Sequence, residues 1–298
     1  MLDFKTIYSV DESEYPAPSP NLEDVFLQPT RTFQSNVQVV QIGEHFIVKY
    51  GRNVSFNEAQ SMILVKKRTR VPVPTVYAVG VLSDNEDESF EEITLILMER
   101  IQGYRLDEFS WRLGEEQKRL VGILMRGHLR DLRRLGQPDS VARYFGAIDG
   151  GPFCKESGLN GPYSSESEFI DKFLEEPPPD PSLGPKPQDV IKSEAKLIQQ
   201  FKDACGENRA YFAHGDLLLH NIMLKPDGSL CIIDWERAGW YPQWFEYVNM
   251  GMAAQYATLD IGDKYPEQEA IMSALRASHL DWQVQATRKR LLEEGVEV

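Results

Sequence analysis

The stretch His214-Gly215-Asp216-Leu217-Leu218-Leu219-His220-Asn221, followed downstream by Ile232-Ile233-Asp234-Trp235-Glu236, decides the fold of this chain. Three of its side chains, Asp216, Asn221 and Asp234, have the chemistry that a phosphoryl transfer requires. A hydroxyl group that attacks ATP needs a carboxylate to accept its proton, and the magnesium ion of the nucleotide needs oxygen ligands. The pattern therefore indicates Asp216 as the base and Asn221 with Asp234 as the metal ligands.

A predicted β-hairpin explains how two ligands that are distant in sequence reach one ion. Residues 221–225 and 229–233 are strand-like, and Pro226-Asp227-Gly228 between them is a turn signal. Pairing outward from Asp227 sets Asn221 against Ile233, so Asn221 and Asp234 finish at the same end. The alternative is an ordinary buried hairpin with a polar start, because either half of the pattern is a weak signal when it stands alone.

On these residues the chain resembles the aminoglycoside phosphotransferase family, a small-molecule branch of the protein-kinase-like fold. That family carries an HGDL segment, an Asn shortly after it and, beyond a hairpin, an Ile-Asp-Trp/Phe-Glu segment. The resemblance spans roughly Val37 to Tyr247 and implies the same roles for Asp216, Asn221 and Asp234. Two features differ from related enzymes: Leu218-Leu219-His220 replaces the frequent His-Pro-Gly run, and no lysine stands at position 218, where protein kinases commonly place one.

Composition limits the classes of function that remain. The chain has 298 residues, of which 42% are hydrophobic and 26% are charged, as expected of a globular protein with room for two lobes. A net charge of -14 argues against a nucleic-acid partner and against an anionic membrane surface. The three cysteines are too few for a disulfide framework, and neither a signal peptide nor a long apolar run is visible. We therefore expect a cytoplasmic protein with no nucleic-acid or membrane partner.

The N-terminal part divides into an arm and a hairpin. Residues 1–30 contain four prolines and favour an irregular arm. Residues 37–42 and 45–50 then read as a β-hairpin, in which Lys49 ends an Ile-Val-Lys strand. The resemblance implies that Lys49 contacts the phosphates of ATP, whereas an exposed strand lysine is the commoner fate of this residue type. A glycine-rich phosphate loop of the G-x-G-x-x-G type is missing before it.

Glu58 has two competing interpretations. It follows Ser55 at the start of an amphipathic helix, and by resemblance it is the ion-pair partner that positions Lys49. Ser55 and Glu58 also match a capping box, in which the glutamate bonds the backbone N–H of the capping residue. The sequence favours neither role.

Residues 93–101 read as a buried strand, and Gly103 marks the exit of the chain from it. The resemblance makes Met98 to Ile101 the hinge between two lobes, where backbone groups of Glu99 and Ile101 would bind the adenine base. An ordinary strand end is the alternative. Beyond the hinge, the helical spacing of residues 115–135 and 191–205 predicts a mainly helical region.

These observations predict an α+β, two-lobed, protein-kinase-like fold. Its parts are an irregular arm (1–30), a β-rich nucleotide-binding lobe (31–101) and a helical catalytic and substrate lobe (102–298). The predicted function is transfer of the γ-phosphoryl group from ATP, with Mg²⁺, to a hydroxyl of a small molecule. A protein-kinase-like enzyme and a binding module with little turnover are the alternatives, the second because of Leu218 and the absent glycine pattern.

Overall fold

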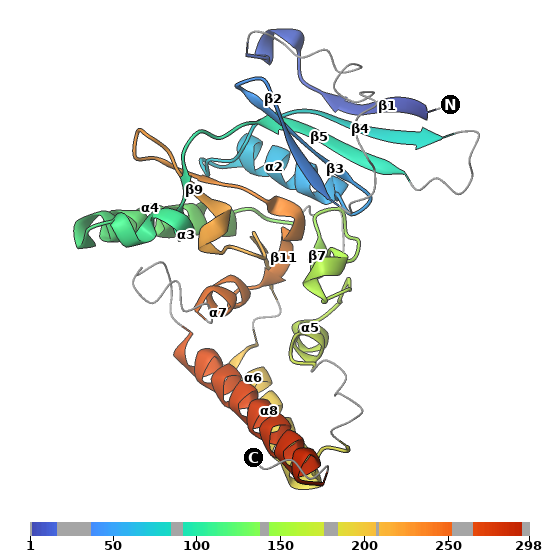
Figure 1. Cartoon of the computed structure of the whole chain (residues 1–298), viewed down its shortest axis with the longest axis vertical. Helices are drawn as coiled ribbons and strands as arrows, with labels where there is room; N and C mark the ends of the chain where they lie inside the picture. The colour runs from blue at the N-terminus through green and yellow to red at the C-terminus, as the bar shows by residue number, and fades with distance from the viewer. Residues whose placement is uncertain are drawn as a thin grey trace.

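The computed structural model describes residues 2–16, 37–84, 92–137, 143–175, 184–206, 209–251 and 265–293. A five-stranded sheet with one helix lies at the top of Figure 1, and a mainly helical part lies below it. The predicted α+β class and its division into a β-rich N-terminal part and a helical C-terminal part are confirmed. Within the described residues, no helix is long and apolar enough to span a membrane.

The upper sheet is antiparallel and has the strand order β1-β4-β5-β3-β2. Its strands are β1 (Leu2–Ser9), β2 (Gln38–Ile42), β3 (Phe46–Gly51), β4 (Val76–Asp84) and β5 (Ile93–Glu99). Helix α2 (Phe56–Arg68) covers one face, where Ile96 and Met98 point into the main core. Leu95 and Leu97 alternate onto the other face and its separate core. Burial on both faces explains why β5 is a nearly continuous apolar run.

The N-terminal arm differs from the sequence prediction. Residues Leu2–Ser9 form β1, an edge strand that pairs with β4 from Leu2 opposite Asp84 to Ser9 opposite Ala78. The first proline, Pro16, comes only after this strand, so proline content across residues 1–30 did not bear on the segment that pairs. The remainder of the predicted arm, residues 17–30, lies outside the described residues.

The lower part begins after Gly103 and is mainly helical. Helix α4 (Glu115–Arg133) confirms the helix predicted over residues 115–135, although it ends before Leu135. It buries Val121, Met125 and Leu132 of the predicted apolar face, together with Leu129. The other elements of this part are α3 (Leu106–Phe109), α5 (Glu166–Phe173), α6 (Gln188–Ala204), α7 (Phe245–Gly251) and α8 (Pro266–Glu293). Helices α6 and α8 lie side by side at the end farthest from the sheet (Figure 1).

Two small sheets join the lobes to the region of the motifs. One has the order β10-β9-β6, with β6 (Tyr104–Arg105), β9 (Ile222–Leu224) and β10 (Leu230–Ile232). The other has the order β7-β11-β8, with β7 (Gly146–Ala147), β8 (Ala210–Ala213) and β11 (Gly239–Pro242). The predicted hairpin is confirmed in its register: Leu224 faces Leu230, and the Ile233 N–H donates to the Asn221 carbonyl at 2.9 Å.

An aromatic cluster around Phe169 of α5 fixes the lower part beneath these sheets. The Phe169 side chain is fully buried, and its ring centroid lies 5.5 Å from that of Phe245 and 5.9 Å from that of Tyr241. Further rings around it belong to Phe145, Phe153, Tyr163, Phe173 and Trp244. Because α5, β11 and α7 all contribute to this cluster, its packing sets where the chain runs after the second motif.

We predict that Phe169→Ala destabilises the fold by about 3–5 kcal/mol, because it leaves a cavity among rings that have no room to collapse. Leu280→Ala on α8 is the control: its side chain is 60% exposed, and the expected loss is below about 0.5 kcal/mol. Urea unfolding followed by tryptophan fluorescence measures both. Equal losses for the two variants would contradict this account of the cluster.

Candidate active site

The loop that carries Asp216 runs between β8 and the 3₁₀ turn Leu219–Asn221, and it depends on Gly215. Gly215 has φ +83°, and a Cβ atom there would lie 2.3 Å from the Arg237 carbonyl oxygen and 2.7 Å from the Tyr241 hydroxyl. Both the backbone angle and the lack of space therefore require glycine at this position. The Tyr241 hydroxyl donates to the same Arg237 carbonyl at 2.6 Å, which fixes the segment that Gly215 packs against.

His214 connects the two sequence motifs. Its ring is completely buried, and burial lowers its pKa. Its Nε2 lies 3.0 Å from the Ile233 carbonyl oxygen, and its Nδ1 accepts from the Asp216 N–H at 3.3 Å. A neutral ring protonated on Nε2 satisfies both contacts. The histidine of the first motif thus holds the loop of Asp216 against the residue that precedes Asp234.

Glu246, at the start of α7, supports the same loop from below. Its Oε2 accepts from the N–H of His214 at 2.5 Å and from the N–H of Gly215 at 3.2 Å. Burial raises the pKa of this carboxyl group to about 7, although the backbone donors oppose the shift. Sequence analysis missed Glu246, which stands in the aromatic run 238–247. Its one signal was a charged residue inside an otherwise uncharged, aromatic-rich segment.

Asn221 and Asp234 meet at one end of the hairpin, as predicted. The Asn221 side chain is 2% exposed, and its amide nitrogen donates to the Asp216 carbonyl at 2.8 Å and lies 3.5 Å from Asp216 Oδ2. Asp234 follows β10 in a left-handed conformation, with φ 64° and ψ 64°. Such a backbone costs a non-glycine residue on the order of 1–3 kcal/mol and persists only where neighbouring contacts fix it. Arg237 Nη1 lies 3.7 Å from Asp216 Oδ1.

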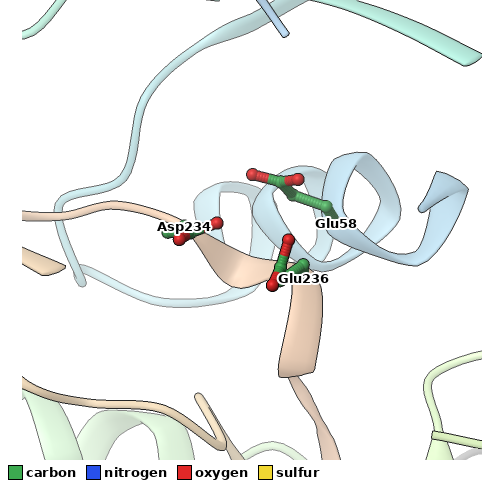
Figure 2. Close-up of side chains that lie close together, drawn as sticks. All are labelled: Glu58, Asp234 and Glu236. Atoms are coloured by element: carbon green, nitrogen blue, oxygen red, sulfur yellow. The ribbon is translucent and has the colours of Figure 1, made fainter. Parts of the chain in front are cut away.

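Lys49 is the centre of charge in the site. Its ammonium group lies 2.8 Å from Glu58, 2.7 Å from Asp234 and 3.2 Å from Glu236, while its side chain is only 8% exposed. Burial alone would lower the pKa of Lys49, but the three carboxylates outweigh it and raise the pKa. The exposed-strand alternative for Lys49 is therefore excluded. Figure 2 shows Glu58 on α2 facing Asp234 and Glu236 on the turn that follows β10.

The two interpretations of Glu58 separate in the structure. Its carboxylate lies on Lys49 rather than on the Ser55 N–H, while the Ser55 hydroxyl caps α2 by accepting from the Asn57 N–H at 3.1 Å. Glu58 is completely buried, and this burial raises its pKa to about 7 against the opposing effect of Lys49. The helix start is thus capped by Ser55, and Glu58 forms the ion pair.

The cavity between the lobes has a volume of about 580 Å³. Its lining includes seven of the eight predicted site residues, namely Lys49, Glu58, Met98, Glu99, Ile101, Asn221 and Asp234. Asp216 is the exception, and it lies beside the cavity through its contact with Asn221. Apolar side chains such as Val39, Ile47 and Met223 complete the wall, which suits a flat aromatic ring.

Some backbone N–H groups of the predicted hinge, residues 98–101, already bond to other parts of the protein. The Glu99 N–H donates to the Thr75 carbonyl at 2.8 Å, and the Glu99 carboxylate accepts from the Thr75 hydroxyl at 2.7 Å. The Arg100 N–H donates to the His45 carbonyl at 2.8 Å. In the part of the chain that the structure describes, no hydrogen bond is formed by the N–H of Ile101, a residue that lines the cavity. Within the predicted hinge, the Ile101 N–H is therefore open to a ligand.

The donor atoms of the site fit a hard divalent cation. Glu58, Asp234 and Glu236 each offer a carboxylate oxygen, and these atoms lie within 4.8 Å of one another. Carboxylate and amide oxygens are the ligands that Mg²⁺ prefers, and with Lys49 the group carries a net negative charge that a cation would offset. Sequence analysis gave Glu236 no role, although it stands in the second motif.

Comparisons with known proteins give a family match and several solved structures of similar fold. The sequence matches the family model described as "Phosphotransferase enzyme family" over residues 35–282. No curated protein sequence is significantly similar to it. Among solved structures, the GDP complex of wild-type aminoglycoside 2'-phosphotransferase-IIIa has a TM-score of 0.54 and 16% identity, covering 91% of this chain and 95% of that chain. A point mutant of that enzyme gives a TM-score of 0.50, with the same identity and coverage. Aminoglycoside phosphotransferase APH(4)-Ia gives 0.48, with 14% identity over 86% of this chain and 83% of that chain.

We predict that Glu246→Gln removes a pH dependence of stability. The pKa of Glu246 rises from 4.5 to about 7 on folding, so the native state binds an extra proton between these values and wild-type stability falls as pH rises through them. Glutamine does not ionise, so the variant should gain stability relative to wild type across this interval, by about 1.4 kcal/mol per pKa unit.

Urea unfolding of both proteins from about pH 4.5 to 8 measures this difference. Glu58, whose pKa is also raised to about 7, is present in both proteins, so its contribution cancels. Parallel stability curves would show that Glu246 does not titrate in this range.

Proposed function

Because this chain belongs to the phosphotransferase enzyme family, we propose that it transfers the γ-phosphoryl group of ATP to a hydroxyl group of a small molecule. Family membership confirms the predicted resemblance and the predicted enzyme class. The observation that carries the proposal is the convergence of Lys49, Glu58, Asn221 and Asp234 on one cavity, with Asp216 beside it. No other described cavity brings together a buried lysine and its carboxylate partners.

In the proposed reaction, the acceptor oxygen forms a bond to the γ-phosphorus while the bond to the β-phosphate oxygen breaks and ADP leaves. Asp216 orients the acceptor hydroxyl and takes its proton. Lys49, held by Glu58, binds phosphate oxygens of the nucleotide. Asn221 and Asp234 hold Mg²⁺, which neutralises charge on the phosphates when it is bound. Met98, Glu99 and Ile101 bind the base, with the Ile101 N–H as a donor.

The nucleotide must compete for Lys49. In the structure, Asp234 and Glu236 both lie within 3.2 Å of the lysine ammonium. A bound phosphate would share that ammonium, and a bound cation would take over Asp234. We therefore propose that nucleotide and Mg²⁺ bind cooperatively. A phosphate that binds Lys49 frees Asp234 for the cation, and a cation that binds Asp234 frees Lys49 for the phosphate.

A binding module with little turnover is the second candidate function. Leu218 stands where protein kinases commonly place a lysine, which leaves less positive charge beside Asp216. Domain limits of 31–101 and 102–298 and a cytoplasmic location remain part of the proposal. Two observations support that location: three cysteines are too few for a disulfide framework, and ATP is a cytoplasmic substrate.

We predict that MgATP raises the melting temperature of the protein. A ligand at a hundredfold excess over its dissociation constant stabilises the native state by about 2.7 kcal/mol. Differential scanning fluorimetry with ATP or GTP, each with and without Mg²⁺, measures this shift and identifies the preferred base. The absence of any shift at millimolar MgATP and MgGTP would count against the nucleotide site.

We predict different signatures for the two aspartates. Asp216→Asn should leave nucleotide affinity nearly intact and reduce turnover by about 10²–10⁴-fold, since it removes only a general base. Asp234→Asn should weaken MgATP binding as well as turnover, because it removes charge that holds the metal. An ADP-release assay over a panel of hydroxyl compounds, with calorimetric titration of nucleotide, measures both effects. If wild type and both variants release ADP at one background rate while binding nucleotide equally, the binding module replaces the enzyme.

A further inference from the structure

Asn57, the neighbour of Glu58 at the start of α2, ties that helix to the opposite lobe. Its Nδ2 donates to the Ala238 carbonyl at 2.8 Å and to the Glu236 carbonyl at 3.3 Å. Its Oδ1 accepts from the Ile148 N–H at 3.0 Å. The residue is 9% exposed, so these bonds form away from solvent. An N-terminal-lobe side chain thus uses both amide hydrogens and its oxygen on the backbone of the C-terminal lobe.

We propose that Asn57 is a positioning residue for phosphoryl transfer. It holds the helix that carries Glu58 against the turn that begins at Asp234, and so fixes the Lys49–Glu58 pair over the predicted metal ligands. This inference rests on the proposed function and adds to it a residue that no sequence motif marks. Asn57 touches none of the reacting groups, so it acts through Glu58 and the Asp234 turn.

The carbonyls that Asn57 binds belong to this turn and to the residue that ends it. The 3₁₀ turn Trp235–Arg237 starts directly after Asp234, and Asn57 binds the carbonyl of its middle residue, Glu236, and that of the residue after it, Ala238. Asp234 has a left-handed backbone that needs fixed surroundings. Asn57 provides part of these surroundings from helix α2, on which the next residue, Glu58, binds Lys49.

The third bond adds a separate segment of the C-terminal lobe. Ile148 directly follows β7, whose Ala147 pairs with Gly239 of β11. Asn57 therefore connects α2 to both the turn after Asp234 and the strand beside it. These contacts fasten the start of α2 to the lower lobe, although α2 packs on the upper sheet.

The chemistry of the site requires an amide. Aspartate has nearly the same shape and keeps the acceptor for the Ile148 N–H, but it has no hydrogens to donate and would set a charge against two carbonyl oxygens. Alanine loses all three bonds and leaves buried backbone groups unpaired. Both variants therefore lose the two hydrogen bonds to the turn after Asp234, whereas only Asn57→Asp keeps the bond from the Ile148 N–H.

If Asn57 only stabilised the fold, its loss would affect affinity and turnover no more than any equally destabilising change in α2. A matched control variant tests this alternative. Thr69 ends the same helix: its hydroxyl donates to the Val65 carbonyl at 2.8 Å and accepts from the Val71 N–H at 3.0 Å. All these partners belong to the upper lobe. Thr69→Ala thus weakens α2 without removing a side-chain bond to the lower lobe, and it leaves the proposed binding groups in place.

The experiment compares wild type, Asn57→Ala, Asn57→Asp and Thr69→Ala in melting temperature, MgADP affinity and ADP release with water as the acceptor. Both Asn57 variants should lose about tenfold or more in kcat/KM for ATP, because small misplacements of catalytic groups cost up to about 10²-fold. MgADP affinity should also fall in both. Thr69→Ala should lower the melting temperature about as much as the Asn57 variants do. Its kcat/KM for ATP and its MgADP affinity should nevertheless stay within about twofold of wild type.

Hydrogen exchange at the Ile148 amide supplies a measurement that does not depend on turnover. Exchange should accelerate in Asn57→Ala and stay slow in Asn57→Asp, whose carboxylate still accepts the bond. The proposal is overturned if the losses of kcat/KM and affinity follow the loss of melting temperature equally in the Asn57 and Thr69 variants. Unchanged Ile148 exchange in Asn57→Ala would also overturn it. If wild type releases no ADP with water or with any compound of the hydroxyl panel, the proposed function fails, and MgADP affinity with Ile148 exchange still decides the role of Asn57.

Discussion

The burial of the Lys49 ammonium group is the constraint on which the site depends. A lysine that is 8% exposed is stable as a cation only if charged partners surround it, and here Glu58, Asp234 and Glu236 lie within 3.2 Å of it. These partners come from a helix of the upper lobe and from the turn that ends the lower hairpin (Figure 2). The electrostatic requirement of one side chain therefore holds two lobes together and brings the candidate metal ligands to their place.

A second set of interactions makes the site rigid through the backbone. His214 bonds the Ile233 carbonyl and accepts from the Asp216 N–H, while Glu246 accepts from the N–H groups of His214 and Gly215. Each bond is made by a buried side chain to a main-chain group, so the loop has little freedom to rearrange. The candidate base is thereby positioned by residues that do not take part in the proposed chemistry.

The sequence predicted those parts of the structure that depend on local pattern. The hairpin register around Asp227 follows from a turn signal between two apolar runs, and the faces of α4 follow from helical spacing. Contacts between residues distant in sequence could not be predicted from local pattern. Asn57 meets Ala238 and Glu246 meets His214 only after the lobes have formed, and an asparagine or glutamate at those positions carries no periodic signal. Strand β1 was missed because the prolines of residues 1–30 were weighed for the whole segment, although all of them follow the strand.

The left-handed backbone at Asp234 limits how this protein can change over evolution. Only glycine, asparagine and aspartate readily adopt φ 64°, so most substitutions there strain the turn as well as removing the carboxylate. Asparagine and glycine are each one nucleotide change away from either aspartate codon. The replacements that the genetic code reaches most easily from Asp234 are thus among the few that preserve the fold while removing the charge. Folded descendants that lack this proposed metal ligand therefore lie one mutation away from the sequence.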